Sequence, residues 1–160
     1  MADIYPDYRD VTIPCNIAPL NFSVCDSTAD GYALQIEAAG QTLWTNADGG
    51  DFCIDKDEWK DALETRTKGG KSGKMTLTIA RRINGEWVGC KPFTMTVMPD
   101  SIDDYITYRL IPPGYSGWYR MGIYQQQLST SEESCIFENS HTQGNCVNCH
   151  TVGSQRAERT

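Results

Sequence analysis

Apolar and polar residues alternate along much of this chain, in the period-two pattern typical of half-buried β-strands. The alternation is clearest over residues 20–24, 32–38, 75–79 and 106–110, and further strands are expected at 118–127 and 135–137. Asn84-Gly85 separates two long stretches, 75–83 and 86–98, and tolerates positive φ at both turn positions. We therefore expect a hairpin with a type I′ turn there, and a core containing Leu34, Ile36, Leu77, Ile79 and Val97.

One short helix is expected at residues 57–65. Asp55 is suited to cap it, and Glu58 follows three residues later, as in a capping box. Trp59, Ala62 and Leu63 would lie on one side of this helix. Many short strands with one helix predict an all-β fold, an antiparallel immunoglobulin-like β-sandwich.

The hydrophobic periodicity stops after Phe137. The sequence therefore predicts two parts: a sandwich over residues 1–137 and an irregular C-terminal segment over residues 138–160.

The charge of the chain limits its partners. The formal net charge is −7, from 14 basic and 21 acidic residues, and no basic stripe offsets it. A phosphate backbone would be repelled, so we expect no nucleic-acid partner. No run of 18 apolar residues occurs, so we expect no membrane span.

The C-terminal segment contains Cys146-Val147-Asn148-Cys149-His150, which matches the Cys-x-x-Cys-His motif of covalent c-type haem. In this chemistry the two thiols add to the haem vinyl groups, and the adjacent imidazole binds the iron. We expect Cys146 and Cys149 to anchor haem c and His150 to be the proximal iron ligand.

Two other interpretations of this motif stay open. Cys146, Cys149, His141 and His150 have the residue types of a structural zinc site, with the two histidines as metal ligands. The two cysteines could also form a redox disulfide, although no βαβ setting of the thioredoxin kind is visible.

His141 is the candidate for the distal haem ligand. It is the only histidine besides His150, and it lies nine residues before it. An exposed loop histidine is the competing interpretation. Met95, Met98 and Met121 are competing thioether ligands, but each lies in an expected strand, where core packing is the better explanation.

The seven cysteines favour an exported protein. With Cys146 and Cys149 assigned to haem, at most two disulfides can form among the remaining five. Met1-Ala2-Asp3 has no basic and apolar leader pattern, which fits either a cytoplasmic protein or a mature domain whose leader has been removed. Because the cysteines favour the second, we expect a periplasmic domain, with membrane tethering through the leader as a further expectation.

Several blocks of the chain carry a family resemblance. They are Tyr5–Tyr8, Val11–Pro14, Asn16–Phe22, Tyr108–Ile111 and, as the most specific, Glu138–Cys146. Together they resemble the N-terminal part of bacterial periplasmic proteins with a TolB-like β-propeller, often labelled cytochrome c biosynthesis proteins. The resemblance implies that a C-terminal propeller domain, absent from this chain, follows the segment in the full-length protein.

The expected function is that of a periplasmic c-type haem domain for electron transfer or haem handling, with an unknown redox partner. No nucleophile–base pair or carboxylate pair suggests an enzyme. The alternative is a non-catalytic module that binds glycan or protein and keeps a structural metal or a vestigial motif. The crowded aromatics Tyr105, Tyr108, Tyr115, Trp118, Tyr119 and Tyr124 could stack on sugars or form the wall of a haem site.

Overall fold

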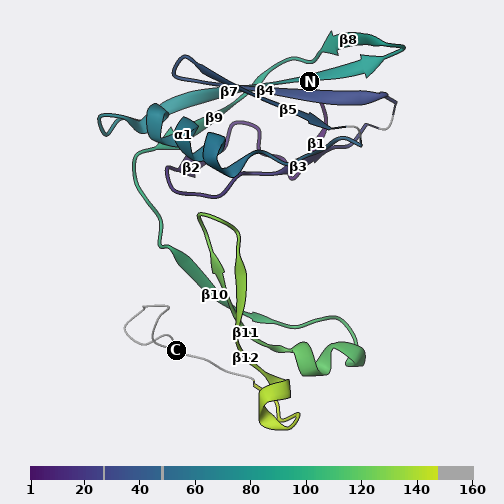
Figure 1. The fold of residues 1–160 in the computed structure, drawn as a ribbon, viewed down its shortest axis with the longest axis vertical. Helices are drawn as coiled ribbons and strands as arrows, with labels where there is room; N and C mark the ends of the chain where they lie inside the picture. Colours follow the sequence, from purple (N-terminus) through teal and green to yellow (C-terminus); the bar gives the residue numbers. More distant parts are fainter. Residues whose placement is uncertain (27, 48, 148–160) are drawn as a thin grey trace. The chain divides into compact units, whose positions relative to one another are not determined.

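The computed structural model describes residues 1–26, 28–47 and 49–147. They are mostly strand, arranged in largely antiparallel sheets with a single α-helix among them, so the expected all-β class is confirmed (Figure 1). The chain divides into two compact units, Met1–Ile102 and Asp103–Thr160. The expected boundary after Phe137 is therefore misplaced. The strands within residues 105–138, which the sequence placed in the sandwich, pair with one another and form a sheet of their own.

The first unit is built on a six-stranded sheet. Its strands are β2 (Thr12–Pro14), β4 (Gly31–Ala38), β5 (Gln41–Ala47), β7 (Gly73–Ile83), β8 (Glu86–Gly89) and β9 (Phe93–Met98). The order is β2-β9-β7-β4-β5, with β8 also paired to β7, and only the β2–β9 pair is parallel. The expected stretch 86–98 is thus two strands, separated near Pro92, which has no N–H to continue a ladder.

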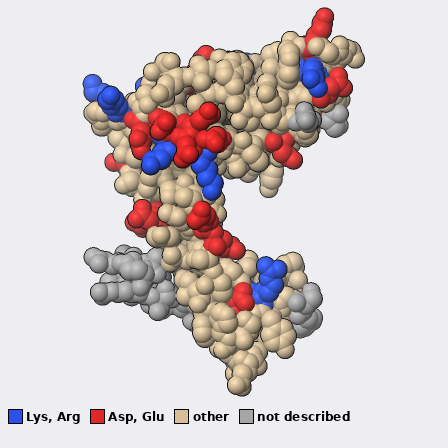
Figure 2. Space-filling view, viewed as in Figure 1, with Lys and Arg blue, Asp and Glu red and all other residues tan. Residues whose placement is uncertain are grey.

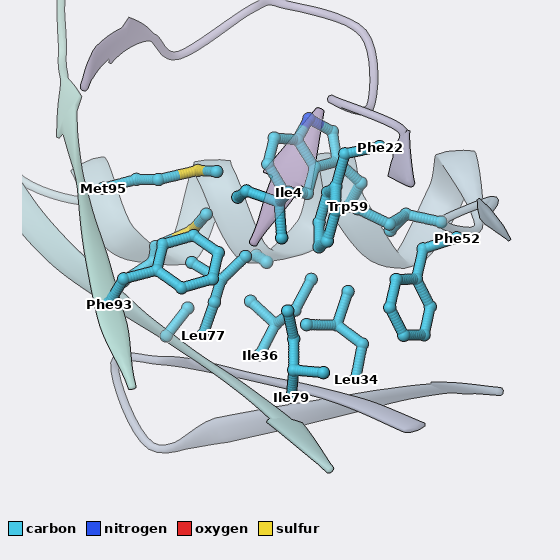
Figure 3. Close-up of a cluster of buried hydrophobic side chains, with 14 of the residues drawn as sticks. Ile4, Phe22, Leu34, Ile36, Phe52, Trp59, Leu77, Ile79, Phe93 and Met95 are labelled. Atoms are coloured by element: carbon cyan, nitrogen blue, oxygen red, sulfur yellow. The ribbon is translucent and has the colours of Figure 1, made fainter. Parts of the chain in front are cut away.

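A smaller sheet and a helix complete the first unit. The small sheet has the order β1-β3-β6, from β1 (Ile4–Tyr5), β3 (Phe22–Val24) and β6 (Asp51–Phe52). Helix α1 (Lys56–Thr67) contacts β4, β7 and β9 of the large sheet. The side chains of these elements meet in one core, which gives the unit a sandwich-like build (Figure 3).

The core follows from the alternation in the sequence. Leu34, Ile36, Leu77, Ile79 and Val97 are all buried, as predicted. From the opposite side, the Phe22 ring lies 5.3 Å from the Phe52 ring and 6.3 Å from the Phe93 ring. Trp59 of α1 is buried beside them, and its indole N–H donates to the Ile17 carbonyl at 3.0 Å. Burial of this many large apolar groups is the main stabilising term of the unit.

Two local predictions are also confirmed. Asn84 and Gly85 have φ of 53° and 85°, as a type I′ turn requires, and they connect β7 to β8. The Asp55 carboxylate accepts the N–H groups of Asp57 and Glu58, both at 3.0 Å, and so caps α1.

The outward face of the large sheet carries two exposed tryptophans. Trp44 on β5 is 62% exposed and Trp87 on β8 is 53% exposed. Trp44 pairs across the strands with Gln35, and Trp87 pairs with Arg82, whose guanidinium lies 5.7 Å from the indole ring centre. Directly paired residues share a face of a sheet, so these side chains stand on the side away from the core.

The second unit is a three-stranded antiparallel sheet with two short 3-10 helices. The strands are β10 (Tyr105–Leu110), β11 (Gly122–Gln127) and β12 (Glu133–Glu138), in the order β10-β11-β12. Helix η1 (Tyr115–Arg120) precedes β11, and η2 (Asn139–Thr142) follows β12. The expected strand 118–127 therefore begins only at Gly122, because the Met121 N–H closes a turn on the Trp118 carbonyl at 3.2 Å.

Acidic side chains gather over α1 in Figure 2, where the helix carries Asp57 and Glu58 in its first turn. This surface would repel a polyanion. In the described ranges no helix combines the length and the apolar composition needed to cross a membrane.

Candidate functional site

The segment that leads to the motif is organised by Asn139, which is fully buried at the start of η2. Its side-chain amide donates to the Trp118 carbonyl at 2.9 Å, and its side-chain oxygen accepts the Val147 N–H at 2.6 Å. Its backbone N–H donates to the Met121 carbonyl, and its carbonyl accepts the Gly144 N–H at 3.0 Å. Asn139 therefore ties the residue after Cys146 to the sheet.

Two further contacts hold the same turn. The Trp118 indole N–H donates to the Gly144 carbonyl at 2.9 Å. Gly122 lies against the end of β12, where a Cβ at this position would stand 2.3 Å from the Phe137 carbonyl oxygen. Only glycine permits this close approach of β11 to the end of β12, next to the bond from the Asn139 N–H to the Met121 carbonyl.

Cys146 is exposed and carries a free thiol. Arg109 of β10 lies beside it, with its Nη2 3.9 Å from the Cys146 sulfur and 3.2 Å from the Met121 sulfur. The Arg109 Nε is buried and has no hydrogen-bond partner within the part of the chain that the structure describes. Cys146 thus lies beside a cation that has no anionic partner there.

His141 is exposed and forms part of a capping box with Glu138. The Glu138 N–H donates to His141 Nδ1 at 3.3 Å, and the Glu138 carboxylate accepts the His141 backbone N–H. The imidazole also packs edge-on against the Phe137 ring, with 5.6 Å between the ring centres. When Nδ1 accepts a hydrogen bond, the proton of a neutral imidazole is on Nε2.

This tautomer bears on metal binding by His141. Metal-bound histidines normally donate their other ring N–H to an acceptor. Here the other nitrogen faces a donor, so binding iron or zinc through Nε2 requires the contact with the Glu138 N–H to open.

Glu138 is also the centre of a hydrogen-bonded network on β11 and β12. It accepts the Tyr124 hydroxyl and the Ser140 hydroxyl, the latter at 3.0 Å. These two bonds lower the pKa of the Glu138 carboxyl. The bond to Glu138, together with burial, raises the pKa of Tyr124, and burial raises the pKa of the nearby Cys135 thiol.

The remaining predicted site residues divide into three groups. Cys149 and His150 lie outside the described residues. Met95 is buried in the hydrophobic core, and Met121 contacts Arg109. Cys15, Cys25, Cys53, Cys90 and Cys135 are free thiols, so the structure joins none of the five in the disulfides that the sequence allowed.

Among the described residues, no three side chains of histidine, cysteine, aspartate or glutamate gather as a metal site would require. Two members of the expected zinc set lie outside those residues, so the haem and zinc interpretations both stay predictions.

Sequence reasoning did not identify Asn139 or Arg109. Arg109 is the only charged residue in the strand Tyr105–Leu110. A single charged residue in a strand is a signal by which the sequence could have identified it. Asn139 had no such signal, because a polar residue after a strand is typical of any turn.

The comparisons with known proteins give no match. No protein-family model, no curated protein and no solved structure is similar to this chain at a significant level.

Proposed function

We propose that this chain is a periplasmic c-type haem-binding domain that serves electron transfer or haem handling. In this proposal Cys146 and Cys149 form the two thioether bonds, and His150 is the proximal iron ligand. His141 is the candidate distal ligand. The redox partner protein and the β-propeller domain of the full-length protein stay predictions.

The observation that carries the proposal is the setting of Cys146 in the Cys-x-x-Cys-His motif. Its thiol is exposed and free, as addition to a vinyl group requires. Asn139 holds the next residue through the Val147 N–H, so the first anchor has a defined position. Covalent attachment needs accessible thiols, as that of Cys146 is, whereas buried cysteines act as inert apolar filler.

The described residues fit haem in one further respect. A bound haem would supply one-electron chemistry at its iron, and Arg109 beside Cys146 would place a positive charge next to it. His141 fits less directly, because its Nδ1 accepts the Glu138 N–H and that bond must open first.

The proposal is tested by producing the chain together with haem-attachment machinery in a bacterial periplasm. A haem-stained denaturing gel should show a band at the position of the chain, because thioether bonds survive denaturation. Cys146→Ala and Cys149→Ala should each weaken or abolish that band. Cys135→Ala is the matched control, since Cys135 is also exposed but lies outside the motif. A wild-type chain that is folded, exported and unstained would refute the proposal.

A second candidate function is a non-catalytic module that binds glycan. It is favoured by the exposed Trp44 and Trp87 on the outward face of the large sheet, since flat aromatic rings stack on sugars. In this case the motif would be vestigial or would hold a structural zinc. Glycan-array binding that is lost in Trp44→Ala and Trp87→Ala, without haem attachment, would favour this function over the first.

A further inference from the structure

The two exposed tryptophans of the first unit stand on one face of the large sheet. Trp44 of β5 pairs with Gln35 of β4, and Trp87 of β8 pairs with Arg82 of β7. Gln35 lies opposite Thr78 of β7, four residues before Arg82, and the pairing of β4 with β7 is continuous between them. Residues an even number of positions apart in a strand share a face, so both indole rings belong to the same outward surface.

The register of the strands gives the spacing of the two rings. Trp44 and Trp87 are separated by three strand spacings, across β5, β4, β7 and β8, and by four residues along β4. With about 4.8 Å between strands and about 3.3 Å per residue, their backbones lie about 20 Å apart on a diagonal line. One unit of an extended β-1,4-linked sugar chain is about as long as one strand spacing, so about four units reach from one ring to the other.

The surface between the rings is mostly small and uncharged. We call it the tryptophan face; it comprises the outward-facing residues of the ranges 31–35, 44–46, 78–82 and 87–89. Between Trp44 and Trp87 its uncharged members are Gly31, Ala33, Asn46, Thr78, Ala80 and Gly89, together with Gln35. Arg82 is the one charged side chain within these ranges that faces outward, and its guanidinium donates to the Asp30 carbonyl at 3.1 Å and lies 5.7 Å from the Trp87 ring centre.

This composition does not fit a protein partner. A protein interface has a contiguous apolar core, and its strongest contacts cluster near the centre. On the tryptophan face the two large apolar groups stand at opposite ends. A protein would therefore meet glycine, alanine, amide and hydroxyl groups where the core of the interface should be.

A sugar chain fits the same composition. A sugar ring has an apolar face of C–H groups, which stacks on an indole, and hydroxyls around its edge, which bond to amides. The Gln35 amide donates to the Glu37 carboxylate at 3.1 Å, which orients it beside Trp44. Its second N–H and its oxygen are the donor and acceptor that adjacent hydroxyls of one sugar require.

We propose that the tryptophan face binds an uncharged, unbranched β-1,4-linked polysaccharide, with Trp44 and Trp87 stacking on two sugars of one chain. A β-1,4-linked chain is extended and so reaches both rings on a flat sheet, whereas a helical α-linked chain curves away. The nearly uncharged face matches an uncharged polymer. This inference deepens the second candidate function by naming its substrate class. It concerns the first unit alone, and it holds whether or not the second unit carries haem.

The test is a calorimetric titration of the whole chain with β-1,4-linked hexasaccharides of glucose, mannose, xylose and N-acetylglucosamine, and with the matching disaccharides. Trp44→Ala and Trp87→Ala each remove one ring, and Trp44→Tyr keeps a flat ring. Tyr119→Ala is the matched control, since Tyr119 is 63% exposed but belongs to the second unit. Circular dichroism establishes that each variant is folded, and a haem-stained gel reports haem separately.

We expect at least one of the four hexasaccharides to bind. Each alanine variant should weaken that binding about tenfold or more, as loss of a central aromatic contact does. Trp44→Tyr should stay within about threefold of wild type, and Tyr119→Ala should leave binding unchanged. The disaccharide reaches only one ring, so it should bind about tenfold or more weakly than the hexasaccharide.

Four results would overturn the inference. They are a folded wild-type chain that binds none of the four hexasaccharides, binding that depends on only one of the two tryptophans, and tighter binding of a β-1,4-linked glucuronic acid hexasaccharide than of every uncharged one. The fourth is a concentration-dependent dimer in sedimentation that is lost in Trp44→Ala, which would assign the face to a second copy of the chain. None of these results bears on haem attachment, which the stained gel decides by itself.

Discussion

The two units of this chain are stabilised by different interactions. The first unit buries a large apolar core, in which Leu34, Met75, Leu77 and Val97 have no exposed surface. The second unit buries few apolar residues, and Ile136 and Phe137 remain 39% and 41% exposed. Its order comes from hydrogen bonds, above all those of the one buried polar side chain among the described residues, Asn139. Fold and candidate site therefore depend on separate sets of residues, and substitutions should separate them.

The largest expected effect is in the first unit. Leu77→Ala should lower the free energy of unfolding by about 2–5 kcal/mol, because it leaves a cavity between the sheet and α1. Urea denaturation followed by tryptophan fluorescence measures it. The exposed Thr42→Ala on β5 is the control and should change stability by less than about 0.5 kcal/mol. If Leu77→Ala lowered the free energy of unfolding by no more than this control, Leu77 would not belong to the core.

Asn139→Ala should have the next largest effect, confined to the second unit. It removes the bond to the Trp118 carbonyl and leaves the Val147 N–H without its acceptor, at a cost of about 1–3 kcal/mol. Hydrogen exchange of the Val147 amide should accelerate, while amides of β4 and β7 keep their protection. Asn145→Ala is the control, since Asn145 is exposed and its amide bonds only to the nearby Thr142 carbonyl. Equal exchange rates of the Val147 amide in the two variants would show that Asn139 does not hold this segment in place.

Tyr124→Phe tests the hydrogen-bonded network and should cost about 1 kcal/mol at neutral pH. The bond lowers the pKa of Glu138 from its ordinary value of 4.5, so its contribution is complete above that value and is lost as pH falls through the lowered pKa. The bond also raises the pKa of Tyr124. Its contribution to the free energy of unfolding is therefore complete below the ordinary tyrosine pKa of 10.0 and is lost only as the pH rises further.

The difference in stability between wild type and Tyr124→Phe should therefore be constant from about pH 5 to pH 9 and should shrink in acid. Thermal unfolding of the two proteins across this range measures it. A difference that grows as the pH falls below 4 would contradict the assignment of Glu138 as the ionised acceptor.

His141→Ala should have the smallest effect on stability, about 0.5 kcal/mol or less, because the side chain is exposed. Its effect on the haem-loaded chain is spectroscopic. If His141 is the distal ligand, its loss should convert a low-spin spectrum to high spin and allow carbon monoxide to bind the reduced iron, with haem still attached. An unchanged low-spin spectrum would exclude His141 as the ligand. If the chain instead holds zinc, the same variant should weaken zinc binding.

The sequence predicted most of the first unit, because its signals are local. The alternation of Leu77 and Ile79, the Asn84-Gly85 turn and the Asp55 cap each depend on a few neighbouring residues, and the structure confirms all three. The parallel pairing of β2 with β9 joins residues more than 80 positions apart. No local pattern encodes it.

The second unit was predicted less well for the same physical reason. Ile106, Tyr108 and Leu110 of β10 alternate with polar residues like the strands of the first unit, so this pattern alone did not show that β10 belongs to a separate sheet. The partners of Asn139 are backbone groups of Trp118, Met121 and Val147, which leave no mark on residue type. Cys146 could be predicted as a site residue, because the haem motif requires a fixed residue spacing. Arg109 could not, because its contact with Cys146 depends on how the strands pair.

Intact-mass spectrometry with peptide mapping tests most directly whether the second unit carries covalent haem, as we propose. The whole chain, produced with attachment machinery and denatured before analysis, should gain the mass of one haem. The added mass should map to the peptide that contains Cys146 and Cys149. A denatured chain at the mass of its amino-acid sequence alone, from an exported and folded sample, would contradict covalent haem attachment at these cysteines.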